Sequence, residues 1–300
     1  MTSGLKIVDP LPVGDAQLTS SSVPEADYPA WASGTTYTVG QRVIRTQTHS
    51  VYERATAGGG TAPPETDAVN WARVGPTNRW AMFDQVNSTL TTASGSLIVE
   101  VTPGRVFNAL ALLNVQADAV RVEVIDPNDG TVYDRTIVAN DNTQIGSWWS
   151  WFFQPIRRKK THVLTDLPSY GTAKLRLTLV GTAVAVGTCI LGVISEFGEG
   201  IEAGASAGIQ DFSRKERDAF GNFVLVERSF ARTARWQMKV PAAQVDALID
   251  FLAALRAKPA LFIGSDLYSA TVIYGFFKDF DVVIAYPTFS ECSIELEGLT

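Results

Sequence analysis

The chain has 300 residues, of which 46% are hydrophobic, 19% charged and 10% aromatic. This length suits two or three compact domains, and the composition is that of packed β structure, which excludes a disordered chain. The formal net charge of -6 at pH 7 argues against duplex DNA and anionic membranes as partners, because binding to either is driven by Lys and Arg. We therefore expect no nucleic acid partner and no membrane insertion.

Residues 1–26 are rich in Pro, Ser, Thr and Gly and show no hydrophobic period, so they are predicted to form an extended arm that reaches a neighbour. They have no basic start followed by an apolar stretch, and neither an export signal nor a membrane anchor is expected. Cys189 and Cys292 lie far apart in strand-like runs. Two buried free thiols are expected in place of a disulfide or zinc site, which suits a reducing cytoplasm.

Residues 27–76 form a block in which short apolar runs are separated by turn residues. We predict a small three-stranded β module. A module of this size has little core, so its large apolar residues are expected to supply most of it: Trp31, Tyr37, Val43, Tyr52 and Trp71.

Residues 77–197 contain many short apolar runs at turn-punctuated spacing, the pattern of a β-sandwich or jelly roll. In the clearest run Val120, Val122 and Val124 are expected to face inward and Arg121 and Glu123 outward. The strands are predicted at 96–101, 109–115, 120–126, 131–138, 174–181 and 189–197.

Residues 198–208 are predicted to be a flexible hinge because of their Gly and Ala content. In the third domain, 209–300, residues 222–240 are predicted to form one long strand or a hairpin, and residues 241–257 an amphipathic helix. Strands follow, so the helix is expected to cover one face of an antiparallel sheet. The fold class is therefore mainly β.

The sequence offers no catalytic constellation. His49, in the polar turn THS, and His162 neighbour no Ser, Cys or carboxylate motif that would suggest a catalytic triad, and both are expected at the surface. Asp126–Gly130 could offer carboxylates to calcium, but a hairpin turn needs the same residues and is favoured. Glycosidase carboxylates from distant strands stay open, although nothing indicates a particular pair. We expect no enzyme, no cofactor and no metal.

Two clusters indicate a contact surface. The basic run 157–160 is either a solvated loop or a contact to an acidic subunit. The aromatic run 148–153 places five rings in six residues, and they cannot all enter one core if they alternate along a strand. Some are expected to face a module, another subunit or a sugar, and protein contact is favoured. The candidate subunit contacts are Trp148, Trp149, Trp151, Arg157, Arg158, Lys159 and Lys160.

The small module has a pattern of aromatic, Gly, Val and Pro positions: Trp31, Tyr37, Gly40, Val43, Tyr52, Pro63 and Trp71. In this pattern it resembles the chitin-binding modules attached to bacterial chitinases. In that family sugar stacking uses exposed aromatics soon after the second Tyr, and here the corresponding stretch, 53–60, has no Trp or Tyr. The resemblance leaves Tyr37 and Trp71 as candidates for glycan stacking, with a role in the core as the favoured alternative.

Four runs outside the small module carry a second resemblance: NRWAMFD (78–84), WFFQP (151–155), DLPSY (166–170) and FSRKERDAFGN (212–222). Through these runs the rest of the chain resembles a family of bacteriophage and prophage tail proteins. The third domain, 209–300, contains ARWQMKVP (234–241), the predicted helix, a Gly-containing strand and a closing SIELEG (293–298). In these features it resembles the tube-type β domains of distal-tail and other tail-tip proteins.

The resemblance implies a structural subunit near the baseplate or tail tip, located in the virion and made in the host cytoplasm. Its implied partners are copies of itself in a hexameric or trimeric ring, whose strands pair edge to edge, and other tail proteins. The alternative is a carbohydrate-binding receptor-recognition protein for host surface polysaccharide. A polysaccharide hydrolase is the weakest hypothesis.

Overall fold

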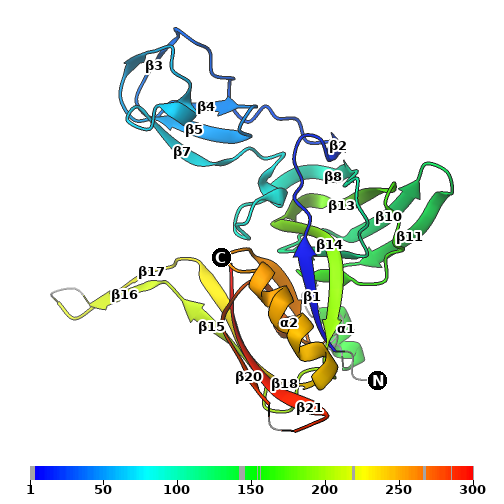
Figure 1. Cartoon of the computed structure of the whole chain (residues 1–300). Coiled ribbons are helices and arrows are strands. Elements are labelled where there is room, and N and C mark those ends of the chain that lie inside the picture. The colour runs from blue at the N-terminus through cyan, green and yellow to red at the C-terminus, as the bar shows by residue number, and fades with distance from the viewer. Residues whose placement is uncertain are drawn as a thin grey trace.

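The computed structural model describes residues 4–141, 146–153, 155, 157–217, 220–265, 268–284 and 286–299. This part of the chain is mainly β, as predicted. It contains a main sheet of nine antiparallel strands, ordered β12-β9-β14-β1-β19-β20-β21-β18-β15, and an outer sheet of five, ordered β11-β10-β13-β8-β2. Figure 1 shows the small module at one end, the outer sheet beside the strands β1 and β14, and the helix α2 on the C-terminal strands.

The small module has the core that the sequence predicts. Tyr37, Val43, Tyr52 and Trp71 are buried together, and Trp31 packs against them. Its strands, in the described residues, form a three-stranded sheet, β4-β5-β7, and a short ladder of β3 and β6. The bounds are β3 Thr36–Tyr37, β4 Arg42–Arg45, β5 Ser50–Arg54, β6 Gly58–Gly59, β7 Trp71–Pro76 and the 3-10 helix η1 Pro64–Thr66.

Replacing Trp71 by Ala is expected to unfold the small module and leave the rest of the chain folded. Loss of a buried Trp costs about 3–5 kcal/mol, which is comparable with the whole stability of so small a unit. In limited proteolysis the Trp71→Ala protein is expected to be cut within residues 28–76, with the remainder resistant. Val69→Ala, at a side chain that is 82% exposed, is the control and should stay intact. Equal resistance of the two variants would show that Trp71 does not hold the core.

The sandwich is built from the outer sheet and the strands β9, β12 and β14 of the main sheet. Val120, Val122 and Val124 of β10 are fully buried between them, as predicted. The side chain of Asp126 accepts hydrogen bonds from the N–H groups of Asn128 and Asp129, which confirms a turn at this position. The bounds are β2 Leu18–Ser21, β8 Thr91–Val101, β9 Ala109–Leu113, β10 Ala119–Asp126, β11 Gly130–Val138, β12 His162–Leu164, β13 Lys174–Val186, β14 Thr188–Phe197 and the 3-10 helix η2 Ala81–Phe83.

The segment predicted as an extended N-terminal arm supplies a central strand. β1, Leu5–Pro10, lies between β14 and β19 in the main sheet, and β2 pairs with β8 of the outer sheet. Leu5 and Ile7 are fully buried beneath α2, whereas Val8 faces the opposite side of the sheet. The prediction was wrong because the composition of residues 1–26, taken as a whole, conceals a short alternating apolar run.

The C-terminal helix covers one face of the main sheet, as predicted. α2 spans Ala242–Ala254, shorter than the predicted 241–257, since Pro241 caps its start and Leu255 its end. Val245, Leu248 and Leu252 point into the core beneath it. The remaining bounds are β15 Ser206–Asp211, β16 Arg214–Arg217, β17 Phe223–Val226, β18 Phe230–Pro241, β19 Ala260–Ile263, β20 Val272–Val283, β21 Phe289–Gly298 and the 3-10 helix η3 Ser269–Thr271.

The predicted hinge, 198–208, is held along β18. The N–H groups of Glu199 and Glu202 donate to the carbonyls of Lys239 and Gln237, and β15 already begins at Ser206. The main sheet therefore continues from the sandwich into the C-terminal part, and the two share one sheet. Glycine content was a poor guide here because glycine also permits close backbone contact: a Cβ on Gly198 would lie 2.5 Å from the Lys239 carbonyl oxygen.

Candidate assembly interface

The strands β16 and β17 form a ribbon that projects from the body between β15 and β18 (Figure 1). Every residue of both strands is exposed. The sequence allowed residues 222–240 to be one strand or a hairpin, but β17 pairs with β16, and β18 follows as a separate strand in the main sheet. A two-stranded ribbon is marginally stable alone in water, so a projecting one favours a partner.

The two strands of the ribbon differ in chemistry. β16 reads RKER and β17 reads FVLV. Since side chains alternate along a strand, Phe223 and Leu225 lie on one face and Val224 and Val226 on the other, each between 44% and 69% exposed. A strand that is apolar on both faces is typical of the interior of a covered sheet. β17 has this composition at the surface.

The base of the ribbon continues the exposed apolar surface. β15 is the terminal strand of the main sheet, and all of its residues are exposed. Its unpaired edge offers N–H and C=O groups to another strand. Ile209, Phe212 and Phe230 add side chains that are 69%, 40% and 50% exposed. The edge and the ribbon thus form one candidate surface for assembly.

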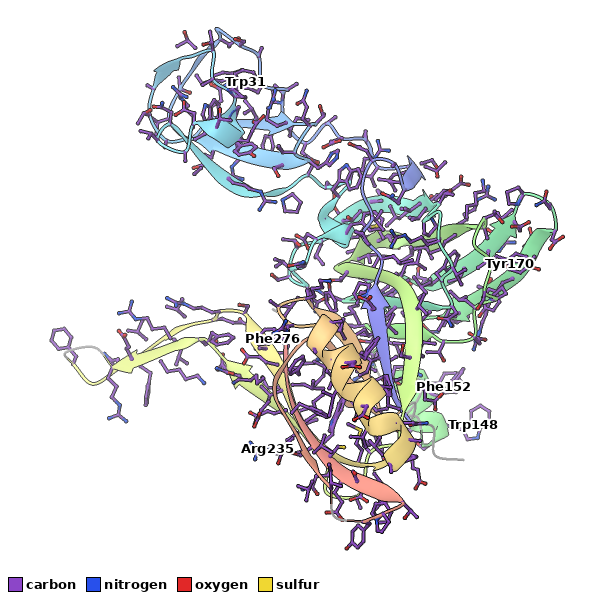
Figure 2. All side chains as sticks on the ribbon, viewed as in Figure 1. Trp31, Trp148, Phe152, Tyr170, Arg235 and Phe276 are labelled. Atoms are coloured by element: carbon purple, nitrogen blue, oxygen red, sulfur yellow. The ribbon has the colours of Figure 1, made fainter. Side chains whose placement is uncertain are left out.

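The aromatic run is a short helix and not part of a strand. α1 spans Trp148–Phe153, and (i, i+4) ring pairs form along it, with centroids 6.5 Å apart for Trp148 and Phe152 and 4.1 Å apart for Trp149 and Phe153. The five rings are between 58% and 81% exposed. Figure 2 shows Trp148 directed away from the body. The expectation that these rings alternate along a strand was wrong. A run made almost entirely of aromatic residues has no hydrophobic periodicity, so its sequence does not distinguish a helix from a strand.

The basic run lies at the base of the loop that carries α1. The Asp141 N–H donates to the Arg157 carbonyl at 2.8 Å, and the Lys159 N–H donates to the Ala139 carbonyl at 2.7 Å. Arg158 forms an ion pair with Asp118. All residues of 157–160 are exposed, and they follow α1 closely in the chain, so the candidate contacts lie at the surface.

The candidate glycan-stacking residues are buried. Tyr37 and Trp71 are 5% and 3% exposed, and their rings meet edge to face with centroids 5.1 Å apart. The Tyr37 hydroxyl accepts a hydrogen bond from the Ala32 N–H at 2.8 Å. The guanidinium of Arg54 lies 4.9 Å from the centre of the Trp71 ring. Neither ring presents a face to a sugar, which corrects this assignment in favour of the core.

The two histidines occupy different environments. His49 is half-buried, stacks on Trp80 at 4.0 Å between ring centroids, and lies 3.2 Å from carboxylate oxygens of Asp15 and Glu25. It contributes to the junction between the small module and the sandwich. His162 is 6% exposed in β12, so its predicted surface position is wrong. The prediction failed because the charged residues before His162 indicate a surface loop, whereas His162 begins a strand that pairs with β9.

Protonation of His162 is expected to destabilise the fold. Burial lowers the pKa of His162, and its Nε2 has no hydrogen-bond partner among the described residues. Below the ordinary histidine pKa of about 6.5 the unfolded chain therefore binds a proton that the folded chain does not. The free energy of unfolding should fall as the pH falls, by at most about 1.4 kcal/mol per pH unit.

Urea titrations between about pH 7 and pH 5 test this linkage. His162→Gln removes the titrating group and should flatten the dependence relative to the unsubstituted protein. Parallel curves for the two proteins would contradict the assignment.

The described residues contain no group of three His, Cys, Asp or Glu side chains that could hold a metal. A cavity of about 500 Å³ is lined by Asp9, Asp84 and Cys189, among others, but burial raises the pKa of Cys189 to about 12, so the thiol is not a ready nucleophile. Cys189 and Cys292 are free and buried, as expected. None of the helices in the described ranges is long and apolar enough to cross a membrane.

The chain was compared with known families and proteins. No protein-family model and no curated protein matches its sequence.

Proposed function

We propose that the protein is a structural subunit of a bacteriophage tail, near the baseplate or tail tip, and that identical subunits form a ring through β-strand pairing. The observation that carries this proposal is the projecting ribbon, whose strand β17 is apolar on both faces and exposed on both. Such a strand is an assembly element, because its side chains leave water only when a neighbour covers them.

A second copy of the chain is the neighbour that fits best. The main sheet ends at β15 on one side and at β12 on the other, so its two ends differ. Contact between unlike surfaces of identical subunits repeats from copy to copy and closes into a ring when the rotation allows it. The ribbon and the β15 edge are adjacent. One neighbouring subunit can therefore pair with the free N–H and C=O groups of β15 and cover the apolar strand β17 at the same time.

The resemblance to tail proteins supports this role. One of its matching runs, residues 212–222, includes β16 and leads to the start of β17, so it falls on the ribbon. The small module projects from the sandwich, on the side away from the C-terminal strands, and would decorate the ring (Figure 1). Recognition of a glycan is not favoured, because the candidate rings Tyr37 and Trp71 are buried.

Antibody labelling of phage particles tests the proposal. Gold-labelled antibodies against the small module are expected to mark one end of the tail in electron micrographs of particles that carry this gene. An antibody against a cytoplasmic host protein serves as the control. Particles that contain no trace of the chain, by labelling and by mass spectrometry, would overturn the assignment to the tail.

A further inference from the structure

We propose that the helix α1 and the cations behind it bind the surface of an anionic membrane, with the helix inserted at the level of the lipid headgroups. We call residues 148–153 the aromatic knob. This inference rests on the knob and its basic base, which the ring of the proposed function does not use.

All five rings of the knob are exposed to water. The side chains of Trp148, Trp149 and Trp151 are 81%, 71% and 58% exposed, and those of Phe152 and Phe153 are 71% and 66% exposed. A helix that packs on a protein surface buries its apolar stripe and leaves its other side polar. The knob buries none of its rings against the body, although five of its six residues are aromatic. Its surface therefore fits an apolar medium outside the subunit.

The size and residue types of the knob suit the lipid interface. Six helical residues span about 9 Å, similar to the depth to which interfacial helices enter a bilayer, roughly 5–10 Å. Trp is favoured at this level, because its ring is apolar and its N–H is polar. Figure 2 shows Trp148 and Phe152 at the edge of the molecule, on the short helix α1.

The charges behind the knob select an anionic surface. Arg157, Lys159 and Lys160 are exposed at the base of the loop, and backbone hydrogen bonds from Asp141 to Arg157 and from Lys159 to Ala139 hold this base in place. Inserted rings would therefore bring three cations to the level of the phosphates. The net charge of -6 led us to expect no membrane contact, but this local cluster is positive and lies beside the rings.

Flotation of the full-length protein with vesicles tests the proposal. Binding is expected to vesicles of phosphatidylglycerol at low salt, with much weaker binding to phosphatidylcholine. Trp71, Trp80 and Trp236 are buried, and Trp31 is partly buried in the small module. Quenching of tryptophan fluorescence by lipids with brominated acyl chains should therefore report mainly on the knob.

Two triple variants separate the contribution of the aromatic rings to membrane binding from that of the cations. Replacing Trp148, Trp149 and Trp151 by Ala should weaken binding by more than about a hundredfold. Replacing Arg157, Lys159 and Lys160 by Gln should weaken it by roughly a hundredfold. The control, Arg105→Gln with Arg256→Gln and Lys258→Gln, makes the same change in net charge at exposed positions elsewhere and should bind as the unsubstituted protein does.

Each contrary outcome overturns the proposal. Failure of the unsubstituted protein to float with phosphatidylglycerol vesicles would do so, as would undiminished binding by the tryptophan variant. If that variant instead changed only the oligomeric mass, the knob would be a contact between subunits. Because ring formation is measured without lipid, failure here leaves the proposed function standing.

Discussion

Replacing Phe223 and Leu225 by Glu is expected to convert the assembled protein into monomers while each subunit keeps its stability. The two side chains share one face of β17 and are 65% and 69% exposed in the single chain. Since they contribute little to the fold of the subunit, the unfolding temperature should change little. In the ring they are buried, so each substitution removes about 1.5–3 kcal/mol of apolar contact and adds a charge that must be desolvated.

The expected loss raises the dissociation constant between subunits at least about a hundredfold, given that 1.4 kcal/mol corresponds to a factor of ten. Sedimentation velocity over a range of concentrations measures this change. Val39→Glu with Val69→Glu makes the same change in charge at exposed valines of the small module and is the matched control. A β17 variant that assembles like the control would show that the ribbon does not join subunits.

Ile7→Ala is expected to destabilise the sandwich and the C-terminal part together. The Ile7 side chain is fully buried beneath α2, and β1 is hydrogen-bonded to β14 on one side and to β19 on the other. Loss of such a side chain costs about 2–5 kcal/mol. Because the main sheet joins the sandwich to the C-terminal part through β1, the cost should appear in both parts.

Denaturation with urea and hydrogen exchange measure these effects. The free energy of unfolding should fall by the stated amount, and amides of both β13 and β21 should exchange faster. Ile284→Ala, at a side chain that is 80% exposed, is the control. Faster exchange in β21 with β13 unchanged would mean that the two parts unfold independently, in spite of their common sheet.

Local patterns predicted most of the β structure. Alternation in β10 placed Val120, Val122 and Val124 in the core, and apolar spacing placed α2 on the sheet. Both features depend on neighbours in sequence, so the residues themselves carry the signal. The core of the small module was predicted for a similar reason, because few other large side chains are available to fill it.

Long-range pairing is what the sequence could not reveal. β1 pairs with β14, about 190 residues away in the chain, and its short apolar pattern, Leu5, Ile7 and Val8, could equally belong to an arm. The segment 198–208 has the composition of a linker, yet its backbone bonds to β18. In each case a partner distant in sequence decides the structure, and composition alone does not identify that partner.

The candidate surface could be predicted only in part. The basic and aromatic runs were recognised from their density, but their arrangement around α1 depends on a helix that aromatic residues alone do not favour. The ribbon was missed as an assembly element because FVLV in isolation resembles a buried strand. Its pairing with the charged strand RKER, which leaves it exposed, is visible only in three dimensions.

The oligomeric mass and shape of the purified chain test the central claim most directly. Light scattering over a range of concentrations, combined with negative-stain images, is expected to show closed rings with a fixed number of subunits. In these rings the ribbon and the β15 edge lie in the contacts between subunits. A particle with the mass of one subunit at every concentration would contradict the claim that this chain builds a ring.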